Sequence, residues 1–154
     1  MENREKYLIL TQKVDVLGKL CRNIFAVGYV RTIYTSNKKE QNQLENNVPA
    51  YLLAKGKEII RLLNGIEEVE DLIFMFIHAH SIKLKNESIY YNAEYHAFNK
   101  VCEFIAYNLY ARSQNVDVKS YIYEITGQDK YTTENIRVYI QTLFEKINNI
   151  KNNR

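Results

Sequence analysis

Apolar residues recur at intervals of three and four along most of this chain, which is the spacing of one face of an α-helix. Signals that break helices are scarce, because the 154 residues include one proline and five glycines. The pattern therefore predicts an all-α fold in which residues 1–154 form a single helical domain. We expect a bundle of five or six helices that begins with a long N-terminal helix.

The first segment carries the clearest of these patterns. Alternating steps of three and four are typical of a coiled-coil seam, so we expect this helix to pack against another helix or to self-associate. Gly18 and Gly28 have no Cβ atom and would let a neighbouring helix approach closely. The seam consists of Tyr7, Leu10, Val14, Leu17, Cys21, Ile24 and Gly28.

The polar stretch from about residue 35 to residue 47 interrupts the pattern and contains nothing able to hold a core. It predicts a mobile loop. Asn47 can then cap a helix that has Pro49 in its first turn, where a missing N–H costs nothing. Gly65 is the expected end of that helix.

The next helix opens with acidic residues and closes near Lys83 and Lys85, the charge order that the helix dipole favours. Its middle, residues 72–77, is apolar on all sides, and this predicts the central helix of the fold. A turn at residues 86–88 leads into a fourth helix. A strand over residues 82–91 is the competing interpretation for this part of the chain.

Both cysteines, Cys21 and Cys102, fall on apolar stripes and form no CxxC pair, so we expect two buried thiols. No run of uncharged apolar residues is long enough to span a bilayer, and no signal peptide is visible. These features predict a cytoplasmic protein that does not enter a membrane. Many Asn, Lys, Ile and Tyr residues without tryptophan are typical of an AT-rich genome.

The motifs of common enzymes are missing, including the P-loop, GxGxxG, HExxH, GxSxG and EF-hand patterns. We therefore expect a protein that is not an enzyme and has no catalytic, cofactor-binding or metal-binding residues. The cluster closest to a chemical site is His78 and His80 with Glu94 and His96. Residues two apart on a helix point about 200° from each other, so His78 and His80 could share one metal ion only on a strand.

Residues 98–150 contain a helix-turn-helix-like pattern. Asp117 can cap a short helix that ends at Thr126–Gly127, and Thr132 or Thr133 can cap a periodic last helix. This third of the chain resembles the three-helix core of the OmpR-type winged-helix DNA-binding domain, in which the last helix enters the major groove. The resemblance implies DNA contacts from Arg137, Gln141, Thr142 and Lys146, and a core that includes Ile136, Ile140 and Leu143.

The sequence departs from that family at three points. Thr126 stands where the family usually has Trp, Phe144 stands where it has Arg, and no strand pair for the wing follows Lys146. The net charge of +3 is also modest for a dedicated nucleic-acid binder.

Thirteen tyrosines provide another kind of surface, since a tyrosine offers a rigid apolar ring with a polar tip. We take a protein interface at Tyr34, Tyr90, Tyr95 and Tyr110 as the leading interpretation. The expected function is that of a small non-enzymatic regulator, from an AT-rich bacterium or a mobile element, that binds a protein partner. Nucleic-acid binding through the C-terminal region is the alternative.

Overall fold

The computed structural model describes residues 3–33, 38–88 and 92–126, and also 138–139, 141–143 and 145–146. Side chains are described for residues 3–24, 50–88, 92–122 and 125–126 and for the short C-terminal stretches. The described residues contain helices and no strand, which confirms the all-α bundle with a long N-terminal helix. The helices are α1 (Asn3–Ile33), α2 (Lys38–Asn64), α3 (Val69–Lys85), α4 (Ala93–Ser113), the 3₁₀ helix η1 (Val118–Tyr121) and α5 (Ile122–Ile125).

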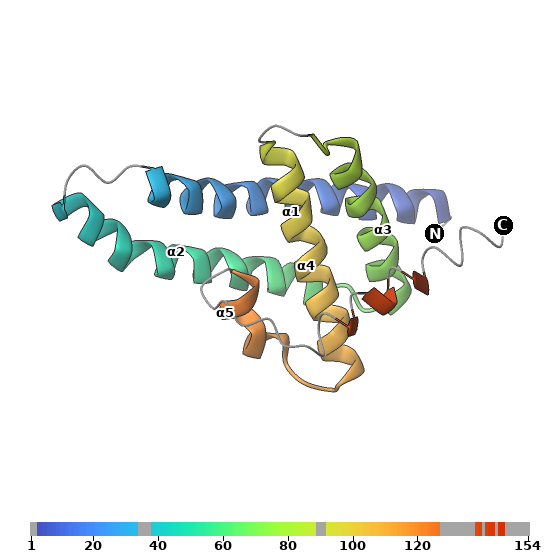
Figure 1. Ribbon diagram of the computed structural model, residues 1–154. Coiled ribbons are helices and arrows are strands. Elements are labelled where there is room, and N and C mark those ends of the chain that lie inside the picture. The colour runs from blue at the N-terminus through green and yellow to red at the C-terminus, as the bar shows by residue number, and fades with distance from the viewer. Residues whose placement is uncertain are drawn as a thin grey trace.

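The long helices form two antiparallel pairs that cross each other. Helices α1 and α2 lie side by side, and the α3–α4 pair runs across them (Figure 1). Helix α4 contacts α1, α2 and α3, while η1 and α5 close the end of the bundle against α2 and α4. The crossing leaves α1 with one side turned toward α4 and another side available for other contacts.

Helix α4, rather than α3, is the central helix, and the prediction for residues 72–77 is corrected on this point. Eleven side chains of α4 are buried, against four in α3. The buried side chains of α4 include the small residues Ala97, Ala106 and Ala111, and α4 contacts both α1 and α3. Within the apolar run of α3, Ile73, Phe74 and Ile77 are only partly buried, because apolar residues all round a helix do not guarantee that every side finds a neighbour.

The predicted seam of α1 is confirmed from Leu10 to Ile24 as part of the core of this same chain, whereas Tyr7 is 44% exposed and the burial of Gly28 is outside the description. Leu10, Val14, Leu17, Cys21 and Ile24 are all buried. Gly18 also permits a close approach, since a Cβ atom built on it would lie 2.6 Å from the ring tip of Phe98 in α4. The buried part of the seam therefore serves contacts within the chain, and self-association stays a prediction.

Helix α2 begins at Lys38, so the loop expected up to residue 47 is wrong for residues 38–47, which are helical. Asn47 and Pro49 lie inside the helix and not at its start. The physical reason is that Lys, Glu and Gln are good helix formers, and a polar stretch can be an exposed helix as readily as a loop. The expected end is confirmed, since α2 stops at Asn64 and Gly65 follows.

Side chains fix the ends of the following helices. The Asn92 Oδ1 atom accepts hydrogen bonds from the backbone N–H groups of Glu94 and Tyr95, and caps α4. Asp117 caps η1 in the same way through the Lys119 N–H, as the sequence predicted. The competing strand is wrong for residues 82–85, which belong to α3, and residues 89–91 lie outside the described part of the chain.

Candidate functional site

The residues predicted to contact DNA are only partly described. Gln141, Thr142 and Lys146 are exposed in a helical stretch, and Leu143 is buried as expected for the inner face. The Thr142 hydroxyl donates a hydrogen bond to the Val138 carbonyl, which occupies its donor within its own helix. Arg137, Ile136 and Ile140 lie outside the described residues. DNA binding through this helix stays a prediction.

The predicted tyrosine interface is only partly described and stays a prediction. Tyr34 and Tyr90 lie outside the described residues. Tyr110 packs edge to face against Tyr121 and Tyr139, with ring centroids 5.9 and 5.4 Å apart. Tyr95 is partly buried, and the Lys83 ammonium lies over its ring. Both described tyrosines therefore serve contacts within the chain.

The histidines behave as the helical assignment predicts. His78 and His80 both lie on α3, where His78 stacks on Phe74 and His80 on Phe76, four residues earlier in each case. His96 packs against Tyr95. Within the described part of the chain, no group of three or more His, Cys, Asp or Glu side chains could hold a metal ion.

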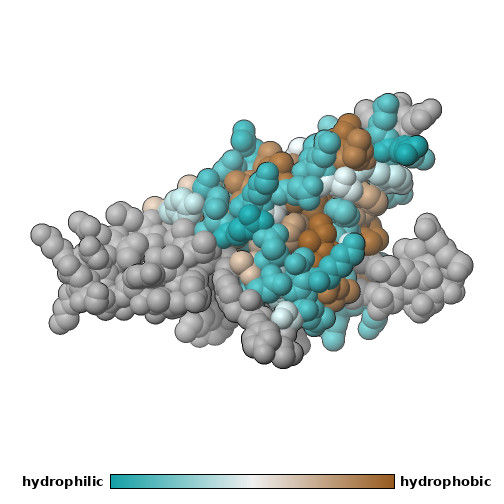
Figure 2. All heavy atoms as spheres, turned by 90° about the horizontal axis from the view of Figure 1, so that it is seen from above, coloured by the Kyte–Doolittle hydropathy of each residue, from teal (hydrophilic) through white to brown (hydrophobic). Residues whose placement is uncertain are grey.

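The apolar surface of the molecule is distributed in patches. Figure 2 shows brown apolar patches set among hydrophilic side chains on the face seen from above. Isolated exposed apolar side chains are common on soluble proteins and need no explanation. A patch becomes informative where several large apolar side chains line one depression.

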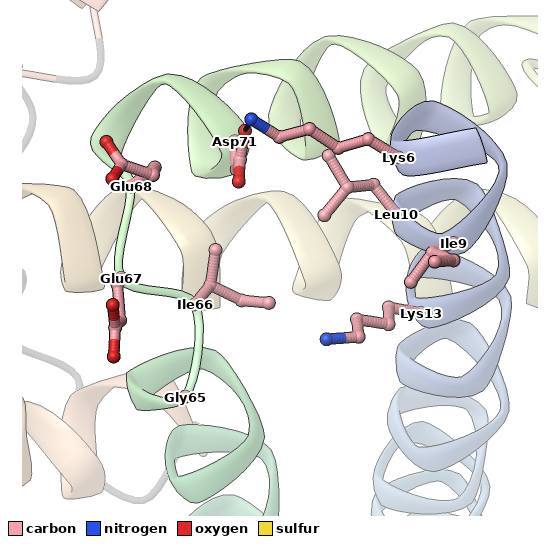
Figure 3. Close-up of a pocket in the computed structure, with 9 residues that line it drawn as sticks. All are labelled: Lys6, Ile9, Leu10, Lys13, Gly65, Ile66, Glu67, Glu68 and Asp71. Atoms are coloured by element: carbon pink, nitrogen blue, oxygen red, sulfur yellow. Dashed lines mark ion pairs between the residues drawn. The ribbon is translucent and has the colours of Figure 1, made fainter. Parts of the chain in front are cut away.

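Such a depression runs between α1 and the end of α2, and we call it the α1–α2 groove. One part, of about 310 Å³, lies between α1 and the linker that joins α2 to α3. The adjoining part, of about 180 Å³, lies between α1 and the last turns of α2. Lys13 and Ile66 line both parts, so the two parts adjoin each other. Figure 3 shows the residues that line the first part, with helix α4 behind them.

The walls of the groove are apolar and partly exposed. Ile9 and Val16 of α1 are 42% and 49% exposed, and Leu62 of α2 is 41% exposed. The floor is formed by buried side chains of the core, including Leu17, Leu63 and Met75. The groove thus exposes aliphatic side chains directly above the hydrophobic core.

Charged groups of both signs surround the groove. The Lys6 ammonium lies 2.9 Å from the Asp71 carboxylate, and this hydrogen bond raises the pKa of Lys6. Lys13 extends from α1 toward the linker that carries Glu67 and Glu68 (Figure 3). No ion pair of Lys13, Glu67 or Glu68 is formed among the described residues. The groove therefore has a cation in its wall and two carboxylates at one end.

The sequence interpretation missed this groove because it followed only the seam. Ile9, Lys13, Val16 and Leu20 form a second stripe with the same spacing, one position ahead of Leu10, Val14, Leu17 and Cys21. Such a neighbouring stripe widens the apolar face of a helix, and the sequence alone does not tell whether a neighbour covers it. The structure leaves Ile9 and Val16 exposed and Leu20 half-buried.

No protein-family model matches the sequence, and no curated protein and no solved structure matches it either. The winged-helix resemblance of the C-terminal region therefore rests on its own residues alone. Among the described helices, none combines the length and the apolar character needed to cross a membrane.

Proposed function

We propose that the chain is a non-enzymatic regulator that binds a protein partner in the α1–α2 groove, within a cytoplasm. The observation that carries the proposal is the set of three large aliphatic side chains, Ile9, Val16 and Leu62, exposed along the two adjoining parts of the groove. The proposal keeps the binding function expected from the sequence and moves the interface from the tyrosines to the groove.

The energetics favour a macromolecular partner over solvent. Full burial of an exposed Val, Leu or Ile side chain is worth about 1.5 to 3 kcal/mol. Since these three side chains are already about half-covered, their remaining burial contributes about 1 kcal/mol each. Such a cluster can anchor an interface, provided that the polar rim around it is also paired.

Site-specific photo-cross-linking tests the proposal. A photoreactive phenylalanine analogue is placed at Val16, in the groove, and separately at Leu84, which is 50% exposed on α3 and outside it. We expect a defined protein to cross-link from position 16 and not from position 84. That protein, once purified, should bind Val16→Glu at least about tenfold more weakly than wild type, because a carboxylate would be buried against aliphatic groups.

Circular dichroism of Val16→Glu shows whether the variant is folded. The proposal is wrong if no adduct is specific to position 16, or if the purified protein binds Val16→Glu and wild type equally.

A further inference from the structure

The walls of the α1–α2 groove have the geometry of a binding site for one more helix. On α1 the stripe of Ile9, Lys13, Val16 and Leu20 advances in steps of four, three and four. Leu62 lies in the opposite wall, and residues three and four apart on a helix share a face. Glu58, Lys55 and Tyr51 therefore continue that wall along α2. Two antiparallel helices with facing stripes leave a furrow that a third helix fills by packing ridges into grooves.

The charges around the α1–α2 groove restrict the kind of molecule that can bind in it. Lys55 and Glu58 pair with each other at 3.7 Å, and Lys6 pairs with Asp71, so these four groups are largely neutralised within the chain. The charges outside these two pairs are Lys13, midway along the α1 wall, and the carboxylates of Glu67 and Glu68 at one end. Glu68 also lies within the field of Lys6, and the Arg112 guanidinium binds the backbone of the same linker. A helix that matches these charges has a carboxylate near Lys13 and cations near Glu67 and Glu68.

A second copy of this chain fits this pattern poorly. An antiparallel two-fold contact that pairs Ile9 of one copy with Val16 of the other is centred next to Lys13. The two Lys13 side chains then face each other, and like charges at an interface are unfavourable.

We propose that the groove receives an amphipathic α-helix of a partner protein, with Lys or Arg at the end over Glu67 and Glu68 and with Asp or Glu opposite Lys13. This inference rests on the proposed function and adds the chemistry of the partner. The apolar face of the helix covers Ile9, Val16 and Leu62, and its charged edge sets its direction in the groove.

Two synthetic peptides test the charge pattern. Each is a stapled helix of about 15 residues, which is long enough to cover the stripe from Ile9 to Leu20 at about 1.5 Å per residue. Both carry leucines at positions 4, 8 and 11, a spacing of about one leucine per turn that places them on one face of the helix. The first has lysines at one end and an equal number of glutamates at its centre, and the second has these charges exchanged, so that the composition is identical.

Fluorescence anisotropy with the full chain at low salt should show that the first peptide binds at least about fivefold more tightly than the second. The difference should shrink at high salt, where exposed charges are screened. The triple variant Lys13→Glu, Glu67→Lys, Glu68→Lys should reverse the order, because it exchanges the charges of the groove. Lys57→Glu, at an exposed position of α2 away from the groove, should leave the order unchanged.

Equal affinities of the two peptides, or no binding of either, would overturn the inference. If neither peptide binds while a protein still cross-links from Val16, the groove binds a protein and only the helix pattern is wrong. If cross-linking also fails, the proposed function fails with it. Light scattering that shows a dimer of the wild type and a monomer of Val16→Glu would assign the groove to a second copy of this chain and contradict the inference.

Discussion

At the scale of single residues, the two thiols show how strongly this core excludes water. Burial raises the pKa of Cys21 well above its ordinary value and raises that of Cys102 from 9.0 to about 12. Neither cysteine is in a disulfide. A thiol whose pKa is raised by burial stays protonated in the folded chain and is a poor nucleophile. These residues act as small apolar side chains, as the sequence predicted.

The raised thiol pKa values predict how stability depends on pH. Below pH 9 the thiols are protonated in both states, so their contribution to stability is complete. Above pH 9 the unfolded chain releases these protons while the folded chain keeps them, and stability falls as pH rises toward about 12. Between pH 8 and pH 10 each thiol should cost on the order of 1 kcal/mol of unfolding free energy.

Urea unfolding at pH 8, 9 and 10 measures this effect when wild type is compared with the Cys21→Ala, Cys102→Ala double variant. Lysines and tyrosines titrate in both proteins, so the difference between the two profiles isolates the thiols. The double variant should be less stable at pH 8 and lose less stability by pH 10. Parallel profiles would show that the thiols do not titrate as their burial implies.

At the scale of elements, the end of helix α2 is held by a residue that is distant in sequence. The Arg112 guanidinium, from the last turn of α4, donates hydrogen bonds to the carbonyls of Leu63, Ile66 and Glu67. Only the Leu63 carbonyl belongs to the last turn of α2, and those of Ile66 and Glu67 belong to the linker that follows. A planar guanidinium can reach all three at once. Arg112 therefore fixes the linker that forms one end of the α1–α2 groove.

We expect Arg112→Lys to lose about 2 kcal/mol of unfolding free energy, because an ammonium keeps the charge but cannot span three carbonyls. Urea denaturation measures the loss. Lys57→Ala, which removes an exposed charge from α2, is the matched control and should change stability by less than about 0.5 kcal/mol. Equal stability of Arg112→Lys and wild type would mean that the fork of hydrogen bonds is not needed to close α2.

The elements also show where sequence reasoning succeeds and where it stops. The seam from Leu10 to Ile24 and the caps at Asp117 and Gly65 were predictable, because spacing and capping are local properties. The start of α2 was not predictable from polarity alone, since residues 38–47 suit a solvated helix as well as a loop.

The candidate site depends on tertiary packing, which local patterns do not contain. The sequence places Val16 beside the seam but does not reveal that the side chain is exposed or that Leu62 lies across from it. It also does not reveal that the ring of Tyr110 packs against the rings of Tyr121 and Tyr139. The exposure of Val16, the position of Leu62 and the packing of Tyr110 all depend on how the helices pack against one another.

At the scale of the whole molecule, helix α1 contributes both to the buried core and to the α1–α2 groove. The seam of α1 is buried in the bundle, while the neighbouring stripe forms a wall of the α1–α2 groove. In Figure 1 the α3–α4 pair crosses the α1–α2 pair, and in Figure 3 helix α4 lies behind the groove. The central claim is that this open side of α1 and α2 is a docking surface for a helix.

Methyl nuclear magnetic resonance tests that claim most directly, with the first of the two peptides titrated into the methyl-labelled full chain. The methyl signals of Ile9, Val16 and Leu62 should shift in a saturable way. Those of Leu84, exposed outside the groove, and of Ile105, buried in α4, should stay in place. Saturable shifts at Leu84 without shifts at the three groove residues, or no saturable shift at all, would contradict the account.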